Sequence, residues 1–232
     1  MKNIFILIYA VILGVHLFAG HQGNAHLAML SKPALLVSLI LFFAITTFKK
    51  KNGKFRDLVL LGLVFCLAGD VFLMFQDLNK SYFLAGLIAF LIGHVFYVWA
   101  FTKTYLSNHE IPLIKRQGWV MILILGYGIM FFREIKEHVG SLIGPVILYT
   151  AVITLMLLMA VNRYGRVGRQ SFWLIALGAA FFVASDSFLA WNKFVHHLPN
   201  SHLLIMGTYG MAQLLIVLGA ARQVEEVKTN GQ

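Results

Sequence analysis

Two carboxylates lie inside long apolar stretches of this sequence, where a charged side chain is costly. Asp70 is in residues 58–76, LVLLGLVFCLAGDVFLMFQ, and Asp186 is in residues 175–192, IALGAAFFVASDSFLAWN. The two stretches align without a gap, and both carry the pattern G-x7-D-x-F-L. An ionisable residue in such a stretch is a candidate functional residue. Two of them at equivalent positions of a repeat indicate one shared site.

A pair of buried carboxylates has a definite chemical use. Two such groups close together in an apolar core cannot both ionise cheaply, so we expect one to stay protonated and the other to be charged. General acid–base catalysis needs that pairing. Two other roles fit the same residues. Each Asp could only join helices by hydrogen bonding to Tyr, Ser or Asn, or the pair could carry an ion or a proton.

The other polar side chains within apolar stretches are few, and they are the candidate substrate-binding residues. Tyr209 and Gln213 are four residues apart and so share a helical face, whereas His94 and Tyr97 are three apart on neighbouring faces. The candidates are Lys32, His94, Tyr97, Tyr149, Ser185, Asn192, Tyr209 and Gln213.

Signatures of other hydrolytic sites are absent from the sequence. His196, His197 and His202 cluster along the chain, but no HExxH-type spacing is present, so we predict neither a metal site nor a cofactor. The G-x-S-x-G pattern of serine hydrolases is also absent, although Ser185 and Ser187 flank Asp186.

The composition predicts an integral membrane protein. The 232 residues are 59% hydrophobic and 12% charged, with a mean hydropathy of +0.80, whereas a soluble domain is about 25% charged. Eight apolar runs favour an all-α bundle of about eight transmembrane helices over a β-barrel. The runs cover residues 4–20, 33–48, 58–75, 83–101, 118–133, 142–161, 171–190 and 203–222.

The eight runs form a single membrane domain, 1–232, which we interpret as two four-helix repeats, about 1–110 and 111–225. Pro33 and Pro145 are expected in the first turns of the second and sixth runs, where a missing N–H costs nothing. An even number of helices in each half makes the repeats parallel, related by a pseudo-two-fold along the membrane normal. Asp70 and Asp186 would then lie at similar depth and meet. The first run could alternatively be a secretory signal peptide.

The distribution of charge predicts the orientation. The net charge of +10 comes from Lys and Arg that flank apolar runs, so it indicates topology and not nucleic-acid binding. Fourteen of these cations fall on the side of the termini and of residues 49–57, 102–117 and 162–170, and five fall on the other side. We therefore expect both termini in the cytoplasm, and the short loops suit a bacterial inner membrane.

The sequence resembles the YhhN-type lysoplasmalogenase family over about residues 5–222. The segments that carry the resemblance are GDVFLMF (69–75), GHVFYVWAF (93–101), ASDSFLAWNKF (184–194) and YGMAQLLIVLGA (209–220), with the Lys32-Pro33 pair. The resemblance implies an eight-helix membrane hydrolase without a cofactor. Its substrate would be a lysophospholipid, whose sn-1 vinyl ether is cleaved to a fatty aldehyde and glycerophosphoethanolamine or glycerophosphocholine. The paired acids of the family would be Asp70 and Asp186.

Acid-catalysed cleavage of a vinyl ether fits two carboxylates, in parallel with the glycosidases. In this hypothesis Lys32, at the outer mouth, attracts the phosphate. Other candidates, His94, Tyr97, Asn192, Tyr209 and Gln213, line a polar pocket, and the lipid tail lies between helices among membrane lipids. The oligomeric state is open. Two alternatives stay open: a proton-coupled transporter of a small or lipid-like solute, and a metal-dependent lipid hydrolase with histidine ligands.

Overall fold

The computed structural model of this integral, multi-pass membrane protein describes residues 2–48, 53–103 and 111–229. Within them, eight helices are long and apolar enough to cross a membrane, which confirms the predicted all-α bundle. They are α1 (Lys2–His21), α2 (Ala25–Thr47), α3 (Gly53–Met74), α4 (Lys80–Lys103), α6 (Gly118–Ile135), α7 (Ile143–Val161), α8 (Arg169–Phe194) and α9 (Ser201–Thr229). A short α5 (Leu113–Arg116) and a 3-10 turn, η1 (Gly140–Leu142), precede α6 and α7.

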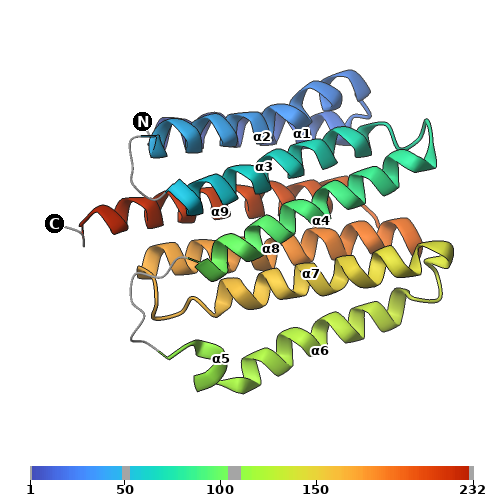
Figure 1. Cartoon of the computed structure of the whole chain (residues 1–232). Helices are drawn as coiled ribbons and strands as arrows, with labels where there is room; N and C mark the ends of the chain where they lie inside the picture. The colour runs from blue at the N-terminus through green and yellow to red at the C-terminus, as the bar shows by residue number, and fades with distance from the viewer. Residues whose placement is uncertain (1, 49–52, 104–110, 230–232) are drawn as a thin grey trace.

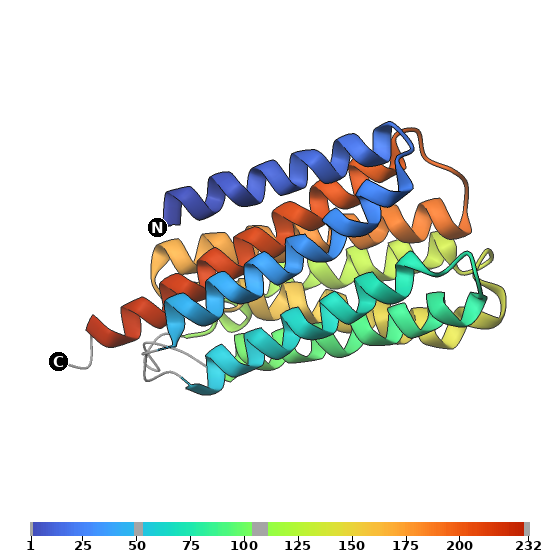
Figure 2. The same cartoon turned by 90° about the horizontal axis from the view of Figure 1, so that it is seen from above.

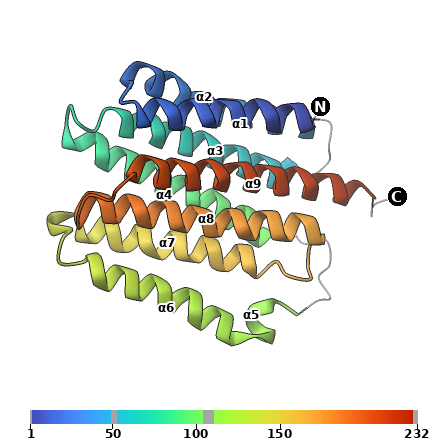
Figure 3. The ribbon, with the colours of Figure 1, turned by 180° about the vertical axis from the view of Figure 1, so that it is seen from behind.

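The long helices run alongside one another, and both termini lie at the same end of the bundle (Figure 1). Seen from behind, α1 and α2 form one edge and α6 forms the other, with α9 crossing the middle (Figure 3). The view from above shows the same arrangement of neighbouring helices (Figure 2). We call the end with the termini the terminal end and the other end the distal end. Lys49, Lys50 and Lys51, counted in the topology prediction, lie outside the described residues.

The start of α2 differs from the prediction. The helix begins at Ala25, where the Asn24 side chain caps it by accepting a hydrogen bond of 3.1 Å from the Leu27 N–H. Pro33 therefore lies inside the helix, and its expected place in the first turn was wrong. Transmembrane helices tolerate an internal proline where neighbouring groups satisfy the freed carbonyl. Pro145 does lie in the first turn, since α7 begins at Ile143.

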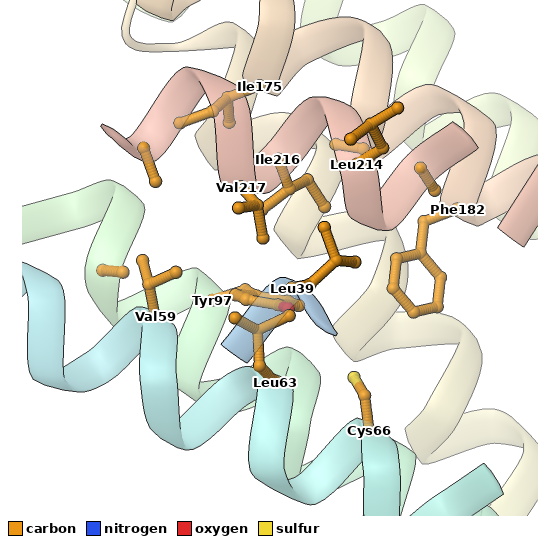
Figure 4. Close-up of a cluster of buried hydrophobic side chains, with 14 of the residues drawn as sticks. Leu39, Val59, Leu63, Cys66, Tyr97, Ile175, Phe182, Leu214, Ile216 and Val217 are labelled. Atoms are coloured by element: carbon orange, nitrogen blue, oxygen red, sulfur yellow. The ribbon is translucent and has the colours of Figure 1, made fainter. Parts of the chain in front are cut away.

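Glycines allow the two closest helix pairs, α3 with α4 and α8 with α9, to approach. A Cβ added at Gly62 would lie 2.6 Å from the Tyr97 ring. A Cβ added at Gly178 would lie 2.9 Å from the Ala212 carbonyl oxygen. In a membrane the hydrophobic effect does not bring helices together, so small residues that allow close van der Waals packing stabilise such pairs. Figure 4 shows the resulting core, in which Leu63 and Val217 belong to helices from opposite halves of the chain.

One pair of helix contacts between the halves is reciprocal. The fourth long helix, α4, packs against α7 of the second half, and the last helix, α9, packs against α2 of the first half. Other contacts have no counterpart in the other half: α1 and α3 each contact α9, whereas α6 contacts only α7 and α8 among the described long helices. The second half is therefore more open on the side of α6.

Candidate active site

The carboxylate of Asp70 is enclosed near the distal end of α3, where the residue is 1% exposed. Lys32 on α2 places its Nζ 3.5 Å from Asp70 Oδ1. Tyr209 on α9 donates a hydrogen bond of 2.7 Å to Asp70 Oδ2. One helix of its own half and one of the other half thus supply its partners. A carboxylate with a cation and a hydroxyl donor at hand satisfies the requirement for burying a charge.

The carboxylate of Asp186 on α8 has a different set of partners. Tyr149 on α7 donates a hydrogen bond of 2.6 Å to Asp186 Oδ2. His94 on α4 places Nε2 3.9 Å from the same oxygen, too far for a hydrogen bond. His94 is fully buried, and neither ring nitrogen has a hydrogen-bond partner within the described part of the chain. A charged imidazole would be costly here. Among the residues that the structure describes, no Lys or Arg forms an ion pair with Asp186.

The two sites are therefore equivalent in position and unequal in charge. Each Asp receives one side chain from the second helix of its own half, which is Lys32 on α2 or Tyr149 on α7. Each receives another from the last helix of the opposite half, which is Tyr209 on α9 or His94 on α4. Asp70 has a cation and a phenol, whereas Asp186 has a phenol and an imidazole.

An aromatic side chain connects the two sites. The ring of Phe182 lies 5.5 Å from that of Tyr209, a partner of Asp70. The same ring lies 4.6 Å from the imidazole of His94, which faces Asp186. The structure gives each carboxylate its own partners, and Phe182 joins these partners edge to face.

A groove of about 700 Å³ reaches Asp186 from the α6 side of the bundle. Its lining is almost entirely apolar or aromatic, as binding sites for lipid chains require. Phe83 and Phe90 from α4 face Phe131 from α6, and Tyr149 and Asp186 form part of the wall. Asp70 does not line this groove. The more open packing of α6 thus exposes one carboxylate to a membrane-facing space while the other stays enclosed.

Comparison with known proteins gives the family of this chain. A family model, described as the YhhN family, matches residues 27–220. The chain belongs to the YhhN family. It is 35% identical to "Lysoplasmalogenase TMEM86A" of Homo sapiens over 175 residues, covering 73% of this chain and 68% of that protein. It is 33% identical to "Lysoplasmalogenase TMEM86B" of Homo sapiens over 171 residues, covering 74% and 66%. No solved structure matches.

Lys32 of this YhhN protein is not at the mouth of a helix, as the sequence had suggested. Because α2 begins at Ala25, Lys32 lies within the helix, and its side chain is only 16% exposed. Its ammonium group faces Asp70, so its charge is already compensated. Because Lys32 pairs with Asp70 and is mostly buried, it is poorly placed to bind a phosphate from solution.

Four other candidates lie apart from the groove in this family member. Tyr97 donates a hydrogen bond of 2.8 Å to Gln213 Oε1, and both residues are fully buried where α4 meets α9. Ser185 donates to the Ile205 carbonyl at 3.0 Å and joins α8 to α9. Asn192 accepts a hydrogen bond of 2.9 Å from the Leu198 N–H and shapes the turn after α8. These contacts are those of packing and turn residues.

The histidines named above do not gather in this YhhN structure. His202 lies beside His16, with ring centroids 4.9 Å apart, and His16 Nδ1 is 2.9 Å from Ser31 Oγ. His196 and His197 follow α8. Among the described residues, no group of three or more His, Cys, Asp or Glu is placed to hold a metal ion.

Sequence reasoning missed Phe182 and Phe90 in this YhhN site. The chain has 20 phenylalanines, so nothing in their type distinguishes the two that contact Tyr209. It also passed over Ser187, whose Oγ lies 2.8 Å from the Tyr127 hydroxyl where α8 faces α6. Its position next to Asp186 was the available signal.

Proposed function

We propose that this protein is a lysoplasmalogenase. It hydrolyses the sn-1 vinyl ether of lysoplasmenylethanolamine or lysoplasmenylcholine to a fatty aldehyde and glycerophosphoethanolamine or glycerophosphocholine. The observation that carries the proposal is the unequal pair of carboxylates, of which Asp186 alone opens onto an apolar groove. The names of the two human relatives, both lysoplasmalogenases, support the same substrate class.

The partners of the two carboxylates suggest how they divide the work. Asp70 faces the Lys32 ammonium, which favours the ionised form. Asp186 faces a phenol and an imidazole in an apolar wall, which favours the neutral acid. We therefore assign Asp186 as the general acid and Asp70 as the carboxylate. The groove leads a lipid to the acid first.

The reaction follows from this assignment and balances. Asp186 delivers its proton to the vinyl carbon farther from the ether oxygen, and the electron pair of the C=C bond leaves an oxocarbenium ion. The Asp186 carboxylate formed in that step removes a proton from the attacking water and so becomes the neutral acid again, while the negative charge of the enclosed Asp70 stabilises the cation. The C–O bond formed gives a hemiacetal. This collapses by breaking the original ether C–O bond, which releases the aldehyde and the glycerol hydroxyl.

The groove accommodates the lipid tail in this scheme. Along α7 it extends from Val146, near the distal end, past Tyr149 to Ile153 and Thr154. Thr154 lies beside Gly128 of α6, where a Cβ added to the glycine would be 2.6 Å from Thr154 Oγ1. The carbons next to the vinyl ether would lie at Asp186, and the remaining chain would follow α7 toward the membrane centre.

The deciding experiment measures aldehyde release from lysoplasmenylethanolamine by purified protein in detergent, with Asp70→Asn and Asp186→Asn alongside. We expect activity in the parent and losses of at least about a hundredfold in both variants. Hydrolysis in D2O should place one deuterium on the aldehyde carbon next to the carbonyl. Full activity in either folded variant would refute the acid–base pair. An inactive parent that moves the lysolipid across liposomes would make the transporter the better assignment.

We further propose that both termini are cytoplasmic and that the protein resides in a bacterial inner membrane. The common terminal end carries most of the Lys and Arg that flank the helices. Arg163, at that end, is nevertheless fully buried, donating to Ser171 Oγ at 3.1 Å and to Gln223 Oε1. Fusing a reporter that is active only in the cytoplasm to each terminus tests the orientation.

A further inference from the structure

A second pocket lies at the distal end, next to the groove. It has an open volume of about 790 Å³ and lies among α3, α4, α8 and the turn before α7. Its polar lining consists of Gln76, Lys80, Ser81, Ser141 and Lys193. Lys80 and Lys193 are two of the five cations on the side opposite the termini, which the topology prediction used only to orient the helices.

Lys193 makes two contacts at this pocket, although the residue is exposed. Its Nζ donates a hydrogen bond of 3.2 Å to Gln76 Oε1, which belongs to the opposite half of the chain. The same ammonium lies 4.8 Å from the centroid of the Phe83 ring, a cation–π distance. Neither Lys80 nor Lys193 forms an ion pair with a carboxylate in the described ranges. Two positive charges thus face the pocket without a compensating acid.

The pocket and the groove share a wall. Phe83 lines both, so an elongated molecule can extend from one to the other past its ring. Lys193 and Asp186 lie on the same helix, seven residues and therefore about 10.5 Å apart along its axis, and on the same face. In a lysoplasmalogen the phosphate follows the vinyl ether by only the three glycerol carbons and two oxygens. With the reach of a lysine side chain, the two groups can be engaged together.

We propose that this distal pocket, formed by Lys80, Lys193, Gln76, Ser81 and Ser141, binds the phosphodiester of the lysophospholipid. The proposal rests on the function proposed above and specifies where the head group lies. The two ammonium groups supply charge, and the two serines supply hydroxyl donors that suit phosphate oxygens. Lys32, to which sequence reasoning gave this role, is occupied by Asp70.

The test compares Lys80→Gln, Lys193→Gln and their double variant with the parent. Lys136→Gln is the matched control, because Lys136 is an exposed lysine at the same end that does not line the pocket. We expect KM for lysoplasmenylethanolamine to rise about three- to tenfold in each single variant and about tenfold or more in the double one, with kcat little changed. Lys136→Gln should behave as the parent does.

Binding measurements make the proposal independent of turnover. A radiolabelled 1-O-alkyl lysophosphoethanolamine, whose saturated ether is not cleaved, should bind at least about tenfold more weakly to the double variant than to the parent. Neutral 1-O-alkylglycerol should bind both proteins equally. Glycerophosphoethanolamine and inorganic phosphate, added as competitors, show whether the pocket takes phosphate from the tailed lipid or also from free anions. Weak competition by these soluble anions is expected, since they lack the tail.

Each outcome can be interpreted. Unchanged binding of the alkyl lysolipid to the double variant would overturn the head-group site, even if the parent hydrolyses lysoplasmalogens. An equal loss of alkylglycerol binding would also overturn it, because the effect would not concern phosphate. If the parent binds the alkyl lysolipid through these lysines and cleaves no vinyl ether, the site stands and the proposed activity fails.

Discussion

Lys32 on α2 and Asp70 on α3 form an ion pair of 3.5 Å in which the carboxylate side chain is 2% exposed. Removing an ion from water costs several kcal/mol, which the partner charge offsets only while both are present. Asp70 Oδ2 also accepts a hydrogen bond from the Tyr209 hydroxyl, which orients the carboxylate. The Lys32 ammonium therefore offsets the charge of Asp70 and ties the second helix to the third.

The first prediction concerns removal of one member of this pair. Lys32→Met leaves the Asp70 charge without its cation, and we expect the free energy of unfolding to fall by about 3 kcal/mol. Lys32→Met combined with Asp70→Asn should be more stable than Lys32→Met alone, since no charge is then stranded. Denaturation in detergent measures both effects. A double variant no more stable than the single one would contradict the ion pair.

The second prediction concerns the phenol that faces the acid. Tyr149→Phe removes the hydrogen bond of 2.6 Å to Asp186 Oδ2 and thus the group that orients it. Hydrogen bonds between neutral groups contribute about 0.5–1.5 kcal/mol, so we expect kcat to fall by about twofold to tenfold. Initial rates of aldehyde release, with unfolding temperatures recorded in parallel, measure the effect.

Tyr9→Phe provides the control for this change. Tyr9 is also a phenol in the helix bundle, fully buried where Tyr149 is partly buried, and its hydroxyl donates to the Gly210 carbonyl at 2.9 Å instead of to a carboxylate. We expect it to lose stability by about 1 kcal/mol and to keep kcat near the parent value. Equal losses of kcat in both variants would mean that Tyr149 acts only through packing.

Hydropathy predicted the eight spans, because lipid imposes long apolar runs. The same reasoning misplaced the start of α2. Pro33 suggested a first turn, but the helix begins earlier, at Ala25, where the Asn24 side chain caps it. The largely apolar residues Ala25–Leu30 continue the helix up to the proline. A proline is a weaker boundary in a membrane, where neighbouring groups compensate for it.

The pairing of side chains could not be obtained in this way. Tyr209 reaches Asp70 across 139 positions of the chain, and a single sequence does not say which helix faces meet. Asp186 and Tyr149 are adjacent for the same reason, through the contact of α7 with α8. The sequence likewise does not show that Lys193 contacts Gln76 and Phe83, since long cationic side chains at helix ends usually extend to water.

The third prediction tests the groove as the site of the lipid tail. Thr150 lines it one residue beyond Tyr149, and Thr150→Phe would fill the space toward the membrane centre. We expect kcat/KM to fall by about tenfold for a long-chain lysoplasmalogen and much less for a short-chain one, because only the long tail needs that space. Competition between substrates of different chain length measures the ratio directly.

Ile147→Phe is the control for this substitution. Ile147 lies on the same helix and is 48% exposed, and it does not line the groove. The ratio of long-chain to short-chain kcat/KM should stay at the parent value. If the ratio were unchanged in Thr150→Phe as well, the lipid tail would not bind in this groove along α7.

The fourth prediction concerns the contact of α8 with α9, on which the position of Asp186 depends. A Cβ at Gly178 would lie 2.9 Å from the Ala212 carbonyl oxygen and 2.9 Å from the Ile216 nitrogen, and neither backbone atom can move without shifting α9. We expect Gly178→Ala to lower the free energy of unfolding by about 1–3 kcal/mol. Gly126→Ala is the matched control, because nothing lies within 4 Å of the added methyl group. That change should be neutral or stabilise the helix by up to about 1 kcal/mol. If Gly178→Ala were as stable as Gly126→Ala in the same detergent, α8 and α9 could not be as close as the structure has them.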